Sequence, residues 1–242
     1  MPSWKQLVPT AIKQQYWQHL HRQKLEGDFG VDKLKYLGEL EYWEAKWQAE
    51  GRDLRNDHYE HEFLAMAGES DRSFVAGKIL ADIGCGPRGS LVWAREARAR
   101  IGIDVLADSY GRFGIRTHDM TYVCAGETRF PLPSGYVDVL FTMNAMDHVD
   151  DFASVCREAI RILAPGGLFV GSFNLNEPAS VCEPQSLTEQ AVQTHLLEKL
   201  EVLQTRTAPR GPGDDRYKYF HEQAPANCDA PPVLWIKARK PA

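Results

Sequence analysis

The glycine-rich segment Ile79–Ser90 holds the residues of this chain best suited to bind a ligand. An apolar run reaches Asp82 and passes into glycines at 84, 86 and 89, which let the backbone turn sharply and approach a ligand without a Cβ in the way. Asp104 ends the next apolar run, where an acidic side chain can accept hydrogen bonds from both ribose hydroxyls of a nucleoside. The segment therefore predicts a nucleoside-binding site.

The three glycines also spell GxGxxG, the pattern of dinucleotide-binding proteins, which is weak evidence when it stands alone. Asp82 argues against a pyrophosphate, because its carboxylate would repel that group and attract an ammonium group. A helix through Leu91–Ala94 is expected beyond the glycines, with its N-terminus facing an anionic group. An NAD-dependent oxidoreductase stays an alternative, although the sequence offers no convincing tyrosine–lysine pair or equivalent for its chemistry.

A mainly parallel β-sheet has to position these residues, because short apolar strands alternate with helical segments after residue 78. Strands are expected at 78–83, 100–103, 122–124, 137–143 and 168–173, and helices at 107–113 and 151–163. A capping box formed by Ser186 and Glu189 predicts a further helix to about Lys199. The last two strands, 201–207 and 233–240, have no convincing helix between them, so an antiparallel pair is expected.

Residues 1–72 are expected to form a helical extension, and residues 73–242 the ligand-binding core. Tyr36, Leu40, Trp43 and Trp47 fall on one face of a helix, for which core packing is the preferred interpretation over a substrate platform. The segment 27–30 is expected to be a turn between two helices.

The histidines at 58 and 61 have spacing that resembles a metal site at first sight. The sequence indicates no third ligand nearby, so a solvated helix and no metal site are expected.

Composition restricts the class of protein. The chain has 242 residues, 43% of them hydrophobic and 25% charged, which is ordinary for a soluble protein with one substantial core. Five scattered cysteines without CxxC spacing predict reduced thiols in a cytoplasmic protein. The net charge of −5 argues against DNA as a partner, and no apolar run approaches the ~20 residues of a membrane span.

Four strings of the sequence, in this order and spacing, resemble the class I SAM-dependent methyltransferases, where SAM is S-adenosylmethionine. They are Leu80–Gly86, Ile101–Asp104, Phe130–Val139 and Arg161–Leu168. The similarity is strongest to the small-molecule group that includes the ubiquinone-biosynthesis methyltransferases. It implies an α/β Rossmann-like fold with seven mostly parallel strands and an antiparallel last strand, N-terminal helices that cap the active site, SAM as cofactor and S-adenosylhomocysteine as product.

The resemblance also implies a set of cofactor-binding residues. They are Asp82, Gly84, Cys85, Gly86, Arg88, Asp104, Val105, Cys124, Ala125, Glu127 and Asn144. The glycine loop would hold the methionine end of SAM, Asp104 the ribose and the loop 124–127 the adenine, while Arg88 would meet the carboxylate. Many relatives carry Asp or Asn in the adenine loop, where this chain has Cys124 or Ala125.

Methyl transfer is an in-line displacement that needs no invariant catalytic residue, since holding the reactants in line supplies much of the acceleration. His148 is the best-placed general base, although a structural or cofactor-loop role is the preferred interpretation. Asp147 would position an acceptor hydroxyl or orient His148. Tyr217, Tyr219 and His221 either border the acceptor pocket or pack within their loop.

We therefore predict methylation of a small molecule or a sugar, mainly at oxygen, in a natural-product or glycan pathway. The alternatives are a SAM-binding protein without transferase activity, the oxidoreductase named above, and an RNA methyltransferase, which would need a basic face. The resemblance leaves a homodimer open.

Overall fold

A computed structural model describes residues 10–30, 33–54, 58–225 and 228–242 of the chain. The chain divides into two compact units, residues 1–52 and residues 53–242. The first unit contains helices α2 (Thr10–Phe29) and α3 (Leu34–Ala49). The predicted turn at 27–30 begins later than expected, because α2 continues through Gly27 and the chain leaves the helix at Gly30 with a φ of +67°.

Helix α3 buries one face, on which Leu37, Leu40 and Glu44 lie. Tyr36, Trp43 and Trp47 of the predicted aromatic stripe are half-buried beside it. The helical spacing was therefore predicted correctly, but the aliphatic residues are the more deeply buried ones.

The second unit is built on a seven-stranded sheet in the order β3-β2-β1-β4-β5-β7-β6. Its strands are β1 (Ile79–Ile83), β2 (Ala99–Asp104), β3 (Thr121–Cys124), β4 (Val137–Met143), β5 (Leu163–Asn174), β6 (Glu201–Pro209) and β7 (Pro232–Arg239). Strands β1 to β5 pair in parallel, whereas β7 runs antiparallel to both β5 and β6. This confirms the predicted Rossmann-like sheet with its antiparallel last strand.

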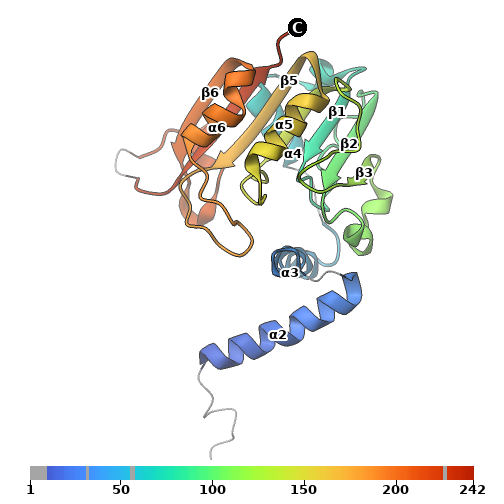
Figure 1. Ribbon diagram of the computed structural model, residues 1–242, viewed down its shortest axis with the longest axis vertical. Helices are drawn as coiled ribbons and strands as arrows, with labels where there is room; N and C mark the ends of the chain where they lie inside the picture. Colours follow the sequence, from blue (N-terminus) through green and yellow to red (C-terminus); the bar gives the residue numbers. More distant parts are fainter. Residues whose placement is uncertain (1–9, 31–32, 55–57, 226–227) are drawn as a thin grey trace, which may run out of the picture. The chain divides into compact units, whose positions relative to one another are not determined.

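Helices cover both faces of this sheet (Figure 1). They are α4 (Tyr59–Ala67), α5 (Phe152–Ile162), α6 (Glu189–His195) and α7 (Lys218–His221). Because side chains alternate along a strand, Ile79, Ala81 and Ile83 of β1 pack on the face covered by α5 and α6. Leu80 packs on the opposite face, with Phe63 of α4.

Short 3₁₀ helices complete the connections. They are η1 (Arg72–Val75), η2 (Ser109–Phe113), η3 (Ile115–Thr117), η4 (Leu197–Lys199) and η5 (Pro212–Asp214). Helix α4 belongs to the second unit, since Phe63 and Met66 are buried in its core. The division of the chain into domains at about residue 72 stays a prediction.

The helix predicted directly after the glycine loop does not form. Residues 84–98, all described, make a series of turns between β1 and β2. Three glycines with positive φ, at 84, 86 and 89, keep the backbone out of the right-handed helical region and so prevent an early start of a helix. Only a few residues then remain before Arg98 donates to the carbonyl of Lys78 at the start of the sheet. The expected anion site at a helix N-terminus is therefore absent from this segment.

The predicted capping box is wrong as well. Helix α6 begins at Glu189, and its N-cap is Thr188, whose side chain accepts a hydrogen bond from the backbone N–H of Ala191 at 3.1 Å. The helix ends at His195 rather than near Lys199, where η4 takes its place.

Candidate functional site

The carboxyl ends of β1 and β4 approach each other closely at one edge of the sheet. Gly84 leaves β1 with a φ of +71° and donates to the carbonyl of Ile103 on β2 at 2.8 Å. A Cβ on Gly84 would lie 2.2 Å from the Cβ of Ala145, just beyond β4. Only glycine fits this place, and it brings together two loops that are far apart in sequence.

Asp82 is buried beside this loop, with 2% of its surface exposed. Its Oδ2 accepts a hydrogen bond from the Ser90 hydroxyl at 2.5 Å, whereas its Oδ1 is buried without a hydrogen-bond partner among the described residues. Burial raises the pKa of the carboxyl to about 8, although the Ser90 hydrogen bond opposes the shift. A buried acceptor without a partner is costly, so this oxygen suits a cationic donor from a ligand.

Asp104, at the end of β2, holds the neighbouring turns in place. Its Oδ2 accepts from the backbone N–H of Gly86 at 3.0 Å, and its Oδ1 accepts from that of Leu106 at 2.9 Å. Each carboxylate oxygen has a second lone pair, so the half-buried side chain can still accept from hydroxyl groups of a ligand.

Side chains that the sequence did not single out fix the turn after the glycine loop. The Tyr122 hydroxyl on β3 accepts from the backbone N–H of Gly89 at 3.1 Å and lies 2.7 Å from Nδ1 of His118. No motif marks these residues, because their contact depends on the pairing of β2 with β3.

Cys85 and Arg88, the other two predicted binding residues of the glycine loop, differ in burial. The Cys85 side chain is buried against Gly102, whose Cβ would lie 2.5 Å from the sulfur, so Cys85 presents only its backbone to a ligand. Arg88 is half-buried near the Tyr59 hydroxyl, and its charge opposes the rise in the pKa of Tyr59 that burial causes.

The residues of the predicted adenine loop separate into two places. Cys124 is exposed and its thiol donates to the carbonyl of Val105 at 3.3 Å, while the Ala125 N–H donates to the carbonyl of Asp104 at 3.3 Å. Glu127 lies farther on, where its Oε2 accepts from the N–H groups of Asp150 and Asp151 at 2.7 and 3.0 Å. Glu127 therefore supports the start of α5, a contact that the sequence did not indicate.

Asn144 follows β4 in an unusual backbone conformation, with a φ of +45°. Its Nδ2 donates to the Tyr217 hydroxyl at 2.8 Å, and that hydroxyl lies 3.2 Å from the hydroxyl of Ser172 on β5. The Oδ1 of Asn144 is buried without a hydrogen-bond partner among the described residues. The carboxyl edge of the sheet therefore has a second buried acceptor without a partner, in addition to Oδ1 of Asp82.

The two predicted catalytic residues lie just beyond Asn144. Asp147 is 4% exposed, its Oδ2 accepts from Nδ2 of Asn174 at 2.8 Å, and its Oδ1 has no partner among the described residues. Burial raises the pKa of Asp147, which the nearby His148 opposes. Arg216 donates to Oδ1 of Asn174 at 3.2 Å and so fixes the amide that orients Asp147.

His148 contacts a carboxylate from a distant loop. Its Nε2 lies 3.2 Å from Oε1 of Glu183, and the hydrogen bond to His148 lowers the pKa of Glu183. Asp147, His148 and Glu183 thus form a cluster at the carboxyl edge that can bind a polar acceptor and move a proton. Sequence reasoning missed Asn174, Glu183 and Arg216, because no local pattern connects them to β4.

Two clusters of described residues have the ligand types and proximity to hold a metal ion. One is Asp147, His148 and Glu183, and the other is His61, Glu62 and His221; within each, the ligand atoms lie within 4.8 Å of one another. The second cluster contains one of the two histidines whose spacing the sequence suggested, and leaves His58 out.

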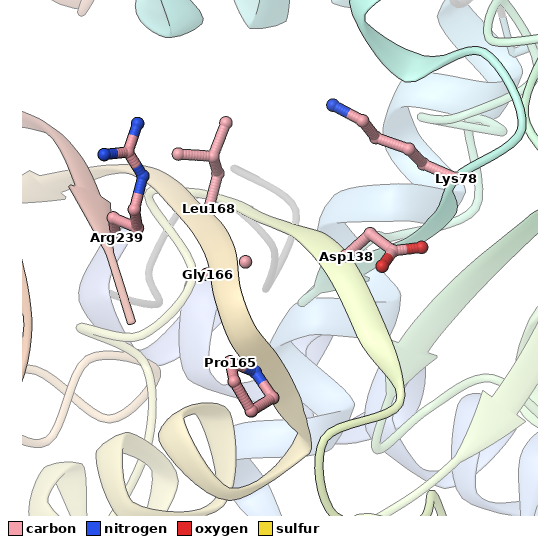
Figure 2. Close-up of a pocket in the computed structure, with 7 residues that line it drawn as sticks. Lys78, Asp138, Pro165, Gly166, Leu168 and Arg239 are labelled. Atoms are coloured by element: carbon pink, nitrogen blue, oxygen red, sulfur yellow. The ribbon is translucent and has the colours of Figure 1, made fainter. Parts of the chain in front are cut away.

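A hollow of about 320 Å³ lies at the opposite edge of the sheet (Figure 2). It is lined by Lys78, Asp138, the segment 165–168 and Arg239, all at the amino ends of parallel strands or the end of antiparallel β7. Asp138 accepts from the backbone N–H of Ile79, and Arg239 pairs with Glu201. In open α/β sheets ligands bind outside the carboxyl ends of the strands, so this hollow is not the candidate site.

Comparisons with known proteins agree with this geometry. Residues 81–171 match the family described as "Methyltransferase domain". The "Ubiquinone biosynthesis O-methyltransferase" of Pseudomonas paraeruginosa is 31% identical over 121 residues, which are 45% of this chain and 50% of that protein. The chain thus spans about half the length of the curated relatives it matches.

Solved structures share the fold. A SAM-dependent methyltransferase from Mesorhizobium loti aligns with a TM-score of 0.55 at 22% identity, over 74% of this chain and 97% of that one. The [4+2]-cyclase SpnF aligns with a TM-score of 0.54 at 19% identity, over 76% and 81% of the two chains. Together the matches confirm the predicted resemblance to class I SAM-dependent methyltransferases, with SAM as the cofactor of that class.

No helix in the described part of the chain is long and apolar enough to cross a membrane.

Proposed function

We propose that this chain transfers the methyl group of SAM to a hydroxyl group of a small molecule or a sugar, in the cytoplasm. The observation that carries the proposal is the buried Oδ1 of Asp82, which has no partner among the described residues and lies beside a glycine loop fixed by Asp104. A group with a positive amino end and a ribose matches both carboxylates, and the methyltransferase matches point to SAM.

The residues at this edge would divide the cofactor between them. Asp82 would accept from the ammonium group of the methionine end, and Asp104 from the ribose hydroxyls. Val105, Cys124 and Ala125 lie together next to Asp104 and would border the adenine. SAM supplies an electrophilic methyl group on a sulfonium, and the task left to the protein is to align an acceptor with it.

The cluster beyond β4 would bind the acceptor. The Oδ1 of Asp147 is buried and without a partner among the described residues, which suits a hydroxyl donor. As the oxygen attacks the methyl group, its proton would pass to Asp147 or to His148, and Glu183 would hold His148 in place. The preference for oxygen rests on the curated relatives, which are named as O-methyltransferases.

Calorimetric titration of the purified chain with SAM, S-adenosylhomocysteine and NADH tests the cofactor. Micromolar binding of the first two and none of NADH is expected. NADH binding without SAM binding would overturn the proposal in favour of an oxidoreductase.

Methyl transfer itself is tested by following S-adenosylhomocysteine production with panels of hydroxylated small molecules and sugars. Asp147→Asn and His148→Ala should slow turnover while SAM affinity stays unchanged. SAM binding without turnover on any acceptor would favour a SAM-binding protein that does not transfer methyl, a reading kept open because a cyclase shares this fold. Steeply salt-dependent binding of RNA would favour an RNA methyltransferase.

A homodimer also remains a prediction, which light scattering of the purified chain checks.

A further inference from the structure

We propose that His61, Glu62 and His221 form a binding site for one zinc-class divalent cation. The site lies on the face of the sheet covered by α4 and joins that helix to α7. It is separate from the cofactor-binding residues, and the proposal goes beyond methyl transfer.

The positions of the ligand atoms suit a single ion. Nε2 of His221 lies 2.9 Å from Oε2 of Glu62, and the ring-nitrogen and carboxylate ligand atoms of all three residues lie within 4.8 Å of one another. Around zinc, with bonds of about 2.0–2.1 Å, neighbouring ligand atoms are about 3.0–3.4 Å apart. Small side-chain movements therefore suffice to bring all three atoms onto one ion.

The two imidazole rings are already placed together. Those of His61 and His221 stack with centroids 4.6 Å apart and planes 29° from parallel. Among the described residues, neither ring nitrogen of His61 forms a hydrogen bond, so His61 gives up no other contact on binding an ion.

Burial and charge favour a cation here. The Glu62 side chain is buried and brings a carboxylate, whereas both histidines are exposed and leave the site open to solvent. Two histidines and one carboxylate are a common set of protein ligands for zinc that keeps a water molecule in the remaining position. The cluster at Asp147 suits a metal less well, because Asn174 already binds Asp147 and only one histidine is present.

An ion at this site would have a consequence for the edge that carries the cofactor. The backbone N–H of His221 donates to the carbonyl of Tyr217 at 3.3 Å, and the Tyr217 hydroxyl accepts from Asn144. Fixing His221 to α4 would therefore restrain the turn that holds Tyr217 beside Asn144.

The test is titration of the full chain, freed of metal by a chelator, with Zn²⁺ in competition with a chromogenic chelator. One ion per chain is expected. His61→Ala and Glu62→Gln should each weaken binding by at least about 10–100-fold, because that is the typical cost of losing an outer partner that only orients a metal ligand, and a direct ligand is lost here. His58→Ala, on the residue before α4, and His195→Ala, on α6, are matched controls and should leave the affinity unchanged.

A second readout protects the test from unfolded variants. At a Zn²⁺ concentration that saturates the wild type, the Tm of the wild type and of both controls should rise, and that of His61→Ala should rise much less. His61 is exposed and takes no part in the Glu62–His221 contact, so the His61→Ala variant should fold. It therefore tests the proposal even if a His221→Ala variant, which loses that contact, does not fold. No Zn²⁺ binding by the wild type, or equal binding by His61→Ala, would overturn the proposal. Because Zn²⁺ alone is the probe, neither result depends on SAM binding or methyl transfer.

Discussion

The buried carboxyl of Asp82 gives the free chain an unusual response to pH. Its pKa is raised to about 8 by burial, against a usual value of 3.8. Between these values the folded chain binds more protons than the unfolded chain, so the free energy of unfolding falls as the pH rises. This loss of stability is absent below about pH 4 and complete above about pH 8.

The first prediction concerns Asp82→Asn, which removes this ionisation. The variant should match the wild type in stability near pH 4 and exceed it by about 1–3 kcal/mol at pH 9, since a buried charge is then avoided. Urea unfolding of both proteins across this pH range measures the difference. Parallel curves for the two proteins would show that Asp82 ionises as an ordinary carboxyl. The same variant should lose most of its SAM affinity.

The second prediction concerns Asp104→Ala, which should weaken SAM binding by about 1–3 kcal/mol because the ribose hydroxyls lose a charged acceptor. The loss also frees the N–H groups of Gly86 and Leu106, so both effects act in the same direction. Glu198→Ala, at an exposed carboxylate on η4 at the opposite edge of the sheet, is the control and should bind SAM normally. Calorimetry measures both, and unchanged affinity in a folded Asp104→Ala variant would refute the ribose assignment.

Sequence reasoning at this scale found residues that stand at strand ends, and missed those that meet them from elsewhere. Asp82, Asp104 and Asn144 could be placed because a strand pattern ends beside each one. Asn174 and Glu183 could not, since their contacts with Asp147 and His148 exist only after β4, β5 and the following loop have come together.

Among the elements, the N-terminus of α6 shows how two neighbouring signals can compete. Ser186 and Glu189 have the spacing of a capping box, yet Thr188 caps the helix. Leu187 lies between them and is 3% exposed, so its burial sets where the chain can turn into the helix.

The third prediction uses this pair. Thr188→Ala should lower the free energy of unfolding by about 1 kcal/mol, because the N–H of Ala191 loses its acceptor. Ser186→Ala, also at an exposed position, should change it little. Thermal and urea unfolding compare the two variants, and a larger effect at Ser186 would mean that the capping box forms after all.

The segment after β1 was the main element that could not be predicted. The sequence pattern strand–glycines–apolar residues is typical of a helix start, but the positive φ at Gly84, Gly86 and Gly89 is a property of the folded backbone. The contact of Gly84 with Ala145 and the bond from Gly89 to Tyr122 come from other strands, and they hold the turns in place of a helix.

At the scale of the whole molecule, the positions of the strands and the antiparallel pair formed by the last two strands could be predicted. The short apolar runs mark the strands, and the loop between the last two has no convincing helix for a parallel crossover. The strand order was not predicted, because the pairing of β1 with both β2 and β4 joins segments that lie far apart in the sequence. The boundary between the compact units lies at 52/53 and was not indicated, since the helix periodicity of α4 looks the same as that of α3.

The fourth prediction is that a fragment of residues 53–242 folds cooperatively and binds SAM with the affinity of the full chain. Both hydrophobic clusters of the sheet draw their residues from position 59 onward, and all predicted cofactor-binding residues lie there too. Circular dichroism melting and calorimetry test the fragment. A fragment that melts without cooperativity would show that residues 1–52 are needed for the core.

The reversed direction of β7 decides where the chain leaves the sheet. Arg239 pairs with Leu168 at the beginning of β5, and Lys240 is held there by bonds with the backbones of Gly166 and Gly167 and by its ammonium group, which donates to the carbonyls of Ile160 and Leu163. A protein immobilised on a biosensor chip through a tag after Ala242 would be attached by the edge opposite Asp82 and Asp104. The loops predicted to bind a nucleoside would face the flowing buffer, so affinities measured on the chip should equal those in free solution.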